Sequence, residues 1–172
     1  MKFIEINSVS NEIFSLALTN CCGSSNWVKK MIQSRPFKNE NDLLEKAELN
    51  WFSCKKKDCL EAFSHHPKIG DIDSLKKKFQ STKIIALQEQ KEVDHASSVV
   101  LKELAENNKL YEKKFGYIFI VCATGKTAEE MLSLLKERMN NDPEKEIKNA
   151  MKEQNKITHI RLKNFLNTNP KF

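Results

Sequence analysis

Two adjacent histidines followed by a proline are the residues whose types and spacing best suit chemistry in this chain. Residues 64–71 read Ser-His-His-Pro-Lys-Ile-Gly-Asp. Pro67 disfavours helical geometry at His66, so this imidazole should project from a fixed backbone at the end of a helix. An imidazole titrates near neutral pH, with an unperturbed pKa of about 6.5. The pattern suggests that His66 transfers protons, and the alternative is a capping or packed histidine.

A second polar group comes later in the chain. Glu89 and Gln90 lie in the stretch 84–93, whose apolar positions predict a half-buried helix. Glu89 could face inward from this helix. The alternative is an ordinary exposed glutamate, because Glu is rarely buried without a partner. The pair gains weight as a candidate only in combination with the histidine motif.

Four residues within a short stretch could together bind zinc: Cys54, Cys59, His65 and His66. Adjacent histidines point in different directions on a helix or a strand, and the spacing matches no recognised zinc motif. The chain has five cysteines, an odd number without the spacing of a disulfide framework. We therefore expect no metal site, and a reducing compartment.

The run 115–123 differs from the rest of the chain, because it is apolar and rich in aromatic and β-branched residues. No second run of this quality is present to pair with it, so we expect a buried extended segment. Its backbone amides then need other partners, and a ligand could be one. The triplet 125–127, Gly-Lys-Thr, is similar to the end of a phosphate-binding loop, but Ile120 stands where that loop requires glycine. We reject nucleotide binding here.

The elements that must position these residues are mostly helical. The chain has 172 residues, of which 30% are charged and 40% hydrophobic, with only four Gly and four Pro. This composition favours an all-α fold, and the length fits a single domain over residues 1–172. We predict a bundle of about seven or eight helices with one buried extended segment.

Capping signals and apolar periodicity place the predicted helices. Three starts carry a capping signal, in the pairs Asp42 with Glu45, Thr127 with Glu130, and Asp142 with Pro143. The last of these opens a long helix whose apolar residues recur up to Phe165. Further helices are predicted over 11–19, 25–33, 57–65 and 84–113, with room for a break in the last.

The charge and the hydropathy of the chain limit the kinds of partner that it can have. The formal net charge is +6, but the lysines are spread along helix faces, with short runs only at 55–57 and 76–78. Scattered charge is typical of a solvated surface, and the aromatic residues fall at core-like positions, so we expect no nucleic-acid partner. A modest positive field would attract a small anionic substrate. The chain shows no signal peptide and no membrane-length apolar run, so we expect a cytoplasmic protein.

In the order of these motifs, the chain resembles the family of 2-oxo-4-hydroxy-4-carboxy-5-ureidoimidazoline (OHCU) decarboxylases. The resemblance covers nearly the whole chain. The most specific features are the block 66–70, which Asp71 follows, and the pair Glu89 and Gln90 at this separation. The other matching residues are Cys21, Cys22, Gly23, Ser24, Ser25, Trp27, Val28, Arg35, Pro36, Phe37, Leu60, Glu61, Ala62, Phe63, Tyr111, Phe115, Gly116, the segment 119–126, Arg138, Ile157, Arg161 and Leu162.

This resemblance implies an all-helical enzyme without a cofactor, usually a homodimer. Such an enzyme converts a small anionic ureidoimidazoline into (S)-allantoin with loss of CO₂, in urate breakdown. The ring imine of the substrate accepts the electrons that the leaving carboxylate releases. The enzyme then has to orient the ring and control its reprotonation.

The resemblance also implies roles for individual residues. His66 is the catalytic acid or proton shuttle, Glu89 aligns the substrate and shares in proton handling, and Gln90 hydrogen-bonds the ring. Pro67 sets the geometry of His66 and forms part of the pocket wall. The substrate oxygens meet the backbone amides of the extended segment and the residue after it, at Phe119, Ile120, Val121, Cys122, Ala123 and Thr124.

Two positions depart from the family pattern. Ala86 stands where many members carry Ser, and Thr124 stands where many carry Arg. A guanidinium grips a carboxylate with two parallel hydrogen bonds, and Thr cannot, so Lys126 becomes the candidate for the missing charge. We interpret these changes as variation within the family. The alternative is a helical binding module that has kept the scaffold and lost catalysis.

Overall fold

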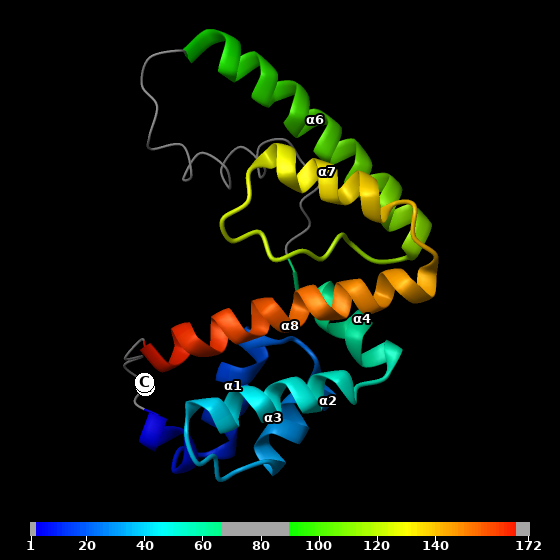
Figure 1. The fold of residues 1–172 in the computed structure, drawn as a ribbon. Coiled ribbons are helices and arrows are strands. Elements are labelled where there is room, and N and C mark those ends of the chain that lie inside the picture. The colour runs from blue at the N-terminus through cyan, green and yellow to red at the C-terminus, as the bar shows by residue number, and fades with distance from the viewer. Residues whose placement is uncertain (1–2, 67–89, 168–172) are drawn as a thin grey trace. The chain divides into compact units, whose positions relative to one another are not determined.

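The computed structural model describes residues 3–66 and 90–167, with side chains at 5–66 and 98–167 (Figure 1). In these two ranges the chain forms seven α-helices and one short 3₁₀ helix, without a strand, which confirms the all-α prediction. The elements are η1 (Phe3–Asn7), α1 (Asn11–Cys21), α2 (Ser25–Gln33), α3 (Glu40–Phe52), α4 (Lys56–Ser64), α6 (Gln90–Phe115), α7 (Ala128–Arg138) and α8 (Pro143–Asn167).

The chain divides into two compact units. Unit 1 contains residues up to His66 and those from Asn149 onward, and unit 2 contains Pro67–Lys148. Helix α8 begins in unit 2 and continues into unit 1. A single domain over 1–172 stays a prediction.

The core of unit 1 forms around α2, which contacts α1, α3 and α4. Two fully buried tryptophans hold its helices together. The indole of Trp27 donates to the carbonyl of Ala47 at 2.9 Å, and the indole of Trp51 donates to the carbonyl of Met151 at 2.8 Å. Trp51 also meets the ring of Phe63 edge to face, with the centroids 6.4 Å apart. These contacts tie α3 and α4 to α8, and α4 is the helix that ends at the two histidines.

Helix boundaries follow the predicted signals at most ends. Helix α2 has the predicted bounds, α1 continues to Cys21, and α4 lies one residue earlier than predicted. Thr127 and Glu130 form the expected capping box at α7, with hydrogen bonds of 2.8 and 3.2 Å. Asp142 caps α8 by accepting from the amide of Lys145 at 2.8 Å.

The predicted start of α3 is wrong by three residues. Asn39, not Asp42, is the N-cap, and its side chain accepts from the amide of Asp42 at 2.9 Å. Asp42 turns back and accepts from the amide of Lys38 at 2.8 Å. Both residue types are good caps, and with Asn39 as the cap the two side chains each accept from one amide at the helix start.

Unit 2 packs α6 against α7, which lie side by side in Figure 1. The segment between them is extended and neither helix nor strand over 118–123. Phe119, Ile120, Val121 and Cys122 are each at most 9% exposed. The structure therefore confirms the buried extended segment.

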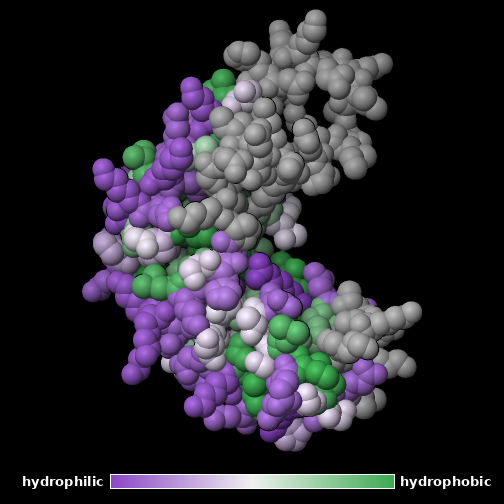
Figure 2. Space-filling model, turned by 180° about the vertical axis from the view of Figure 1, so that it is seen from behind, coloured by the Kyte–Doolittle hydropathy of each residue, from purple (hydrophilic) through white to green (hydrophobic). Residues whose placement is uncertain are grey.

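Figure 2 shows hydrophilic side chains over much of one face of the molecule, with hydrophobic side chains gathered in patches. The large apolar side chains that remain most exposed are Leu16, Leu49 and Leu110. None of the helices in the described part of the chain is both long enough and apolar enough to cross a membrane.

Candidate active site

His66 lies just beyond the last turn of α4. The amide of His65 donates to the carbonyl of Ala62, and the amide of His66 donates to the carbonyl of Phe63, both at 3.2 Å. These bonds continue the turn past Ser64 with the tighter i to i+3 pattern that is common at helix ends. His66 is half-buried there. This is the helix-end position that the sequence predicts for it.

Two carboxylates of α4 fix this helix against its neighbours. Asp58 accepts from the amide of Lys55 and from the side-chain amide of Asn26, both at 2.9 Å. Glu61 accepts from the hydroxyl and the amide of Ser25, which begins α2. Helix α4 is thus bonded to α2 at Asp58 and at Glu61, so His66 projects from a fixed support.

The ring of His66 is in contact with α8. Its Nε2 atom lies 2.5 Å from Oε1 of Gln154, whose side chain is fully buried. The amide nitrogen of Gln154 donates to the hydroxyl of Thr158, one turn further along α8, at 3.1 Å. Neither Gln154 nor Thr158 is among the residues predicted from the sequence. The site in unit 1 is therefore an imidazole that is held by a buried polar pair on α8.

The cysteines near this site are packed thiols. Burial raises the pKa of Cys22 to about 12 and the pKa of Cys59 to about 12. Burial also raises the pKa of Cys54. A nucleophilic cysteine needs the thiolate, which these surroundings disfavour. The described residues hold no group of three or more His, Cys, Asp or Glu side chains placed to bind a metal ion.

His65 faces a different neighbour. A Cβ atom at Gly23 would lie 2.3 Å from Cγ and 2.6 Å from Cβ of His65. Only glycine allows the backbone between α1 and α2 to approach the His65 side chain so closely. The two adjacent histidines thus have separate surroundings, and that of His65 is a packing contact.

We expect Gly23→Ala to lower the free energy of unfolding by about 1–3 kcal/mol, because the new methyl group overpacks the contact with His65. Urea unfolding followed by circular dichroism measures the change. His65→Gly in the same background removes all three contacted atoms and should restore most of the loss. A Gly23→Ala variant as stable as the wild type would show that this close approach does not exist.

The extended segment of unit 2 is held by a buried ion pair. Arg138 Nη1 donates to the carbonyl of Ile120 at 2.8 Å, and its Nε donates to Glu146 Oε1 at 2.8 Å. Tyr111 also donates to Glu146 Oε1, at 2.5 Å, and burial raises the pKa of this phenol, so it remains a donor. The Arg138 guanidinium lies 4.7 Å from the ring centroid of Phe119. The Arg138 side chain thus satisfies one carbonyl of the extended segment, whereas the prediction of a ligand concerned the amide N–H groups of this segment.

The remaining predicted site residues have different positions. Pro67, Glu89 and the side chain of Gln90 lie outside the described residues, as does Ala86. Thr124 is exposed in the turn after the extended segment. His66 belongs to unit 1 and the segment 119–124 to unit 2.

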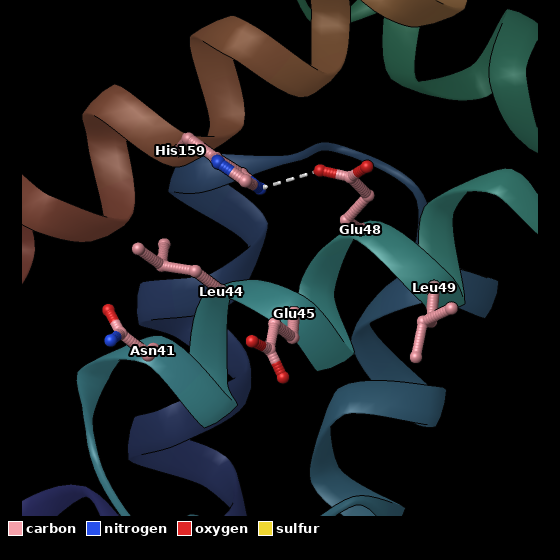
Figure 3. A pocket seen from close by; sticks show the side chains of 6 residues that line it. All are labelled: Asn41, Leu44, Glu45, Glu48, Leu49 and His159. Carbon is pink, nitrogen blue, oxygen red and sulfur yellow. Dashed lines mark ion pairs between the residues drawn. The ribbon is translucent and has the colours of Figure 1, made fainter.

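A separate pocket of about 450 Å³ lies between α3 and α8 of unit 1 (Figure 3). Its lining residues are Asn41, Leu44, Glu45, Glu48, Leu49 and His159. His159 and Glu48 point toward each other across it, with Nε2 and Oε2 3.7 Å apart. None of the residues predicted for catalysis or binding lines this pocket, so we do not assign it to the reaction.

The pocket histidine should give the protein an acid-sensitive stability. Burial lowers the pKa of His159, and the Glu48 carboxylate opposes this shift only in part. The unfolded chain then binds the proton more readily, so the free energy of unfolding falls as the pH drops below about 6.5. His159→Gln should lose less stability than the wild type between about pH 7.5 and 5 in urea unfolding.

Glu48→Gln is the matched control for this effect. It removes the opposing carboxylate, so its loss of stability at acid pH should be larger than that of the wild type. Equal pH dependence in all three proteins would contradict this account of His159.

Comparison with known proteins identifies the family. Residues 7–163 match the family model for OHCU decarboxylase. The uric acid degradation bifunctional protein TTL of Arabidopsis thaliana is 41% identical over 83% of this chain and 44% of its own length. A uric acid degradation bifunctional protein of Bacillus sp. (strain TB-90) is 27% identical over 94% of this chain and 32% of its own. This chain spans less than half the length of these relatives.

The fold agrees with solved structures. A crystal structure of OHCU decarboxylase in the presence of (S)-allantoin matches with a TM-score of 0.72 and 38% identity, over 93% of this chain and 100% of that one. A crystal structure of (S)-allantoin synthase, at 17% identity, matches over 98% of this chain with a TM-score of 0.71, and supports the fold alone. From its helical fold and its match over residues 7–163, the chain belongs to the OHCU decarboxylase family.

Proposed function

We propose that this protein decarboxylates OHCU to (S)-allantoin, with His66 as the group that delivers the proton. The observation that carries the proposal is the placement of His66. In a member of this family, a titratable ring lies at a fixed helix end, and its Nε2 atom meets a buried amide. A ring held in this way can supply a proton in one direction, which stereochemical control requires.

The chemistry needs one proton for each CO₂ released. The bond between the ring carbon and the carboxylate breaks, and its electron pair moves into the adjacent imine of the substrate. A proton then adds to carbon on one face. The imidazolium form of His66 would donate that proton and return to its charged form from water. In this proposal no cofactor or metal takes part.

The other residues keep the roles that the family resemblance gives them. Glu89 aligns the substrate, Gln90 hydrogen-bonds its ring, and Pro67 shapes the wall beside His66. The backbone of 119–123 and Thr124 meets the substrate oxygens. The buried ion pair of Arg138 and Glu146 supports this part of the proposal, because it holds the backbone of the extended segment in a defined place.

We also propose the finer properties that go with this assignment. The protein acts as a homodimer in the cytoplasm, on a small anionic substrate, without nucleic-acid or membrane partners. The net charge of +6 suits an anionic substrate. Sedimentation of the purified protein tests the dimer.

The test of the activity is the rate at which freshly generated OHCU disappears. Adding the protein should accelerate this loss well above the spontaneous rate, before and after exhaustive treatment with a chelator. A rate equal to the spontaneous one would favour the alternative, a binding module on the same scaffold. A chelated protein that regains activity only with zinc would overturn the metal-free mechanism.

A further inference from the structure

The fully buried amide of Gln154 is the feature of unit 1 that the proposed function leaves unexplained. Burying an amide is costly unless its polar atoms find hydrogen-bond partners. Both polar atoms of the Gln154 amide have a hydrogen-bond partner. The oxygen lies 2.5 Å from Nε2 of His66, and the nitrogen donates to the hydroxyl of Thr158 at 3.1 Å.

Thr158 faces the nitrogen end of the amide. The Thr158 side chain is 2% exposed, and its hydroxyl oxygen lies 3.1 Å from the side-chain nitrogen of Gln154. It accepts from the amide nitrogen of Gln154. The amide oxygen is then the end that faces His66.

An amide oxygen only accepts hydrogen bonds, so the nitrogen of His66 that faces it must carry a hydrogen. We propose that Gln154 is a positioning residue that holds His66 in the tautomer with hydrogen on Nε2, which makes Nδ1 the atom that gains and delivers the proton. Thr158 keeps the amide in that orientation. This inference rests on the proposed function for its consequence in catalysis, while the tautomer itself can be measured without substrate.

The direct test is the ¹⁵N spectrum of the His66 ring, in which the protonated and unprotonated nitrogens of a neutral imidazole have well-separated shifts. We expect hydrogen on Nε2 in the wild-type protein above neutral pH. Gln154→Met keeps the length of the side chain and removes the acceptor oxygen, so the ring should become a mixture of tautomers. Gln154→Glu keeps an acceptor oxygen and should keep hydrogen on Nε2. Thr158→Val should give a partial mixture.

Kinetics separate positioning from simple stability. In Gln154→Met, kcat should fall about 10- to 100-fold, in the range of losses when a partner that orients a functional histidine is removed, while KM stays within about twofold. Gln154→Glu should recover part of that kcat. Asn155→Ala is the matched control. Asn155 is the next residue on α8 and bonds to Glu48 instead, so its variant should leave the ring spectrum and kcat unchanged.

A wild-type ring with hydrogen on Nδ1, or a Gln154→Met variant with unchanged tautomer and kcat, would overturn the inference. Should Gln154→Met fail to fold, the wild-type spectrum and Thr158→Val decide the question. A protein with the expected tautomer but no decarboxylation would contradict the proposed function and leave the structural part of this inference standing.

Discussion

Replacing His66 with Ala should lower kcat/KM for decarboxylation by about 10²- to 10⁴-fold, the usual contribution of a positioned acid or base. The fold should survive the change, because His66 is half-buried and lies beyond the end of α4. Its contact with Gln154 is lost, so a modest drop in stability is expected as well. Steady-state kinetics with fresh substrate measure the first effect, and the helical circular dichroism signal checks the second.

His65→Ala is the internal control for this experiment. His65 packs against Gly23 and belongs to a different environment, so its variant should retain most of the activity. Similar losses at both positions would indicate a shared structural role for the two histidines. A His66→Ala protein within about threefold of the wild type would remove His66 from the mechanism.

Replacing Arg138 with Met should lower the free energy of unfolding by about 3–5 kcal/mol. Glu146 is fully buried, and the variant would leave its carboxylate without the opposite charge. The carbonyl of Ile120 would also lose its donor. The free-energy cost of burying these two groups is offset only while the guanidinium is present. Chemical denaturation gives the free energy, and amide hydrogen exchange should show the segment 118–123 opening more easily.

The double variant Arg138→Met with Glu146→Leu tests whether the unpaired charge causes the loss. Replacing both charges by apolar side chains should recover a large part of the stability, because buried ion pairs often contribute little over a packed apolar pair. A double variant that is as unstable as the sum of the two single ones would show that the network acts in another way.

Local signals were enough for most of the fold. Helix α2 and the start of α8 follow directly from apolar spacing, capping residues and Pro143. The extended segment was predictable because its aromatic and β-branched residues suit no amphipathic helix. The start of α3 was not, because Asn39 and Asp42 are both competent caps and the choice depends on which amides the whole turn satisfies.

The candidate site was only half predictable. The position of His66 follows from its neighbour Pro67, since that effect is local. The ion pair of Arg138 with Glu146 joins two helices and is fixed by tertiary packing, so spacing along the chain carries no sign of it.

Gln154 did leave a signal in the sequence. The most buried positions of α8 recur every fourth residue, and they are Glu146, Ala150, Gln154, Thr158 and Leu162. Three of these residues are polar, so a search for apolar residues at helical spacing does not find them. Such a search predicts neighbours such as Ile160 as buried, although Ile160 is 36% exposed. Ala150 and Leu162 lie on one face of α8, and residues 154 and 158 fall between them on the same face whatever their polarity, so this face predicts that Gln154 and Thr158 are buried.

The configuration of the product tests the central claim most directly. OHCU generated freshly from urate decays on its own to racemic allantoin, so optical activity reports only the catalysed reaction. The protein should produce (S)-allantoin in large excess, and His66→Ala should lose that excess along with the rate. Racemic allantoin formed at the spontaneous rate in the presence of the wild-type protein would contradict the account.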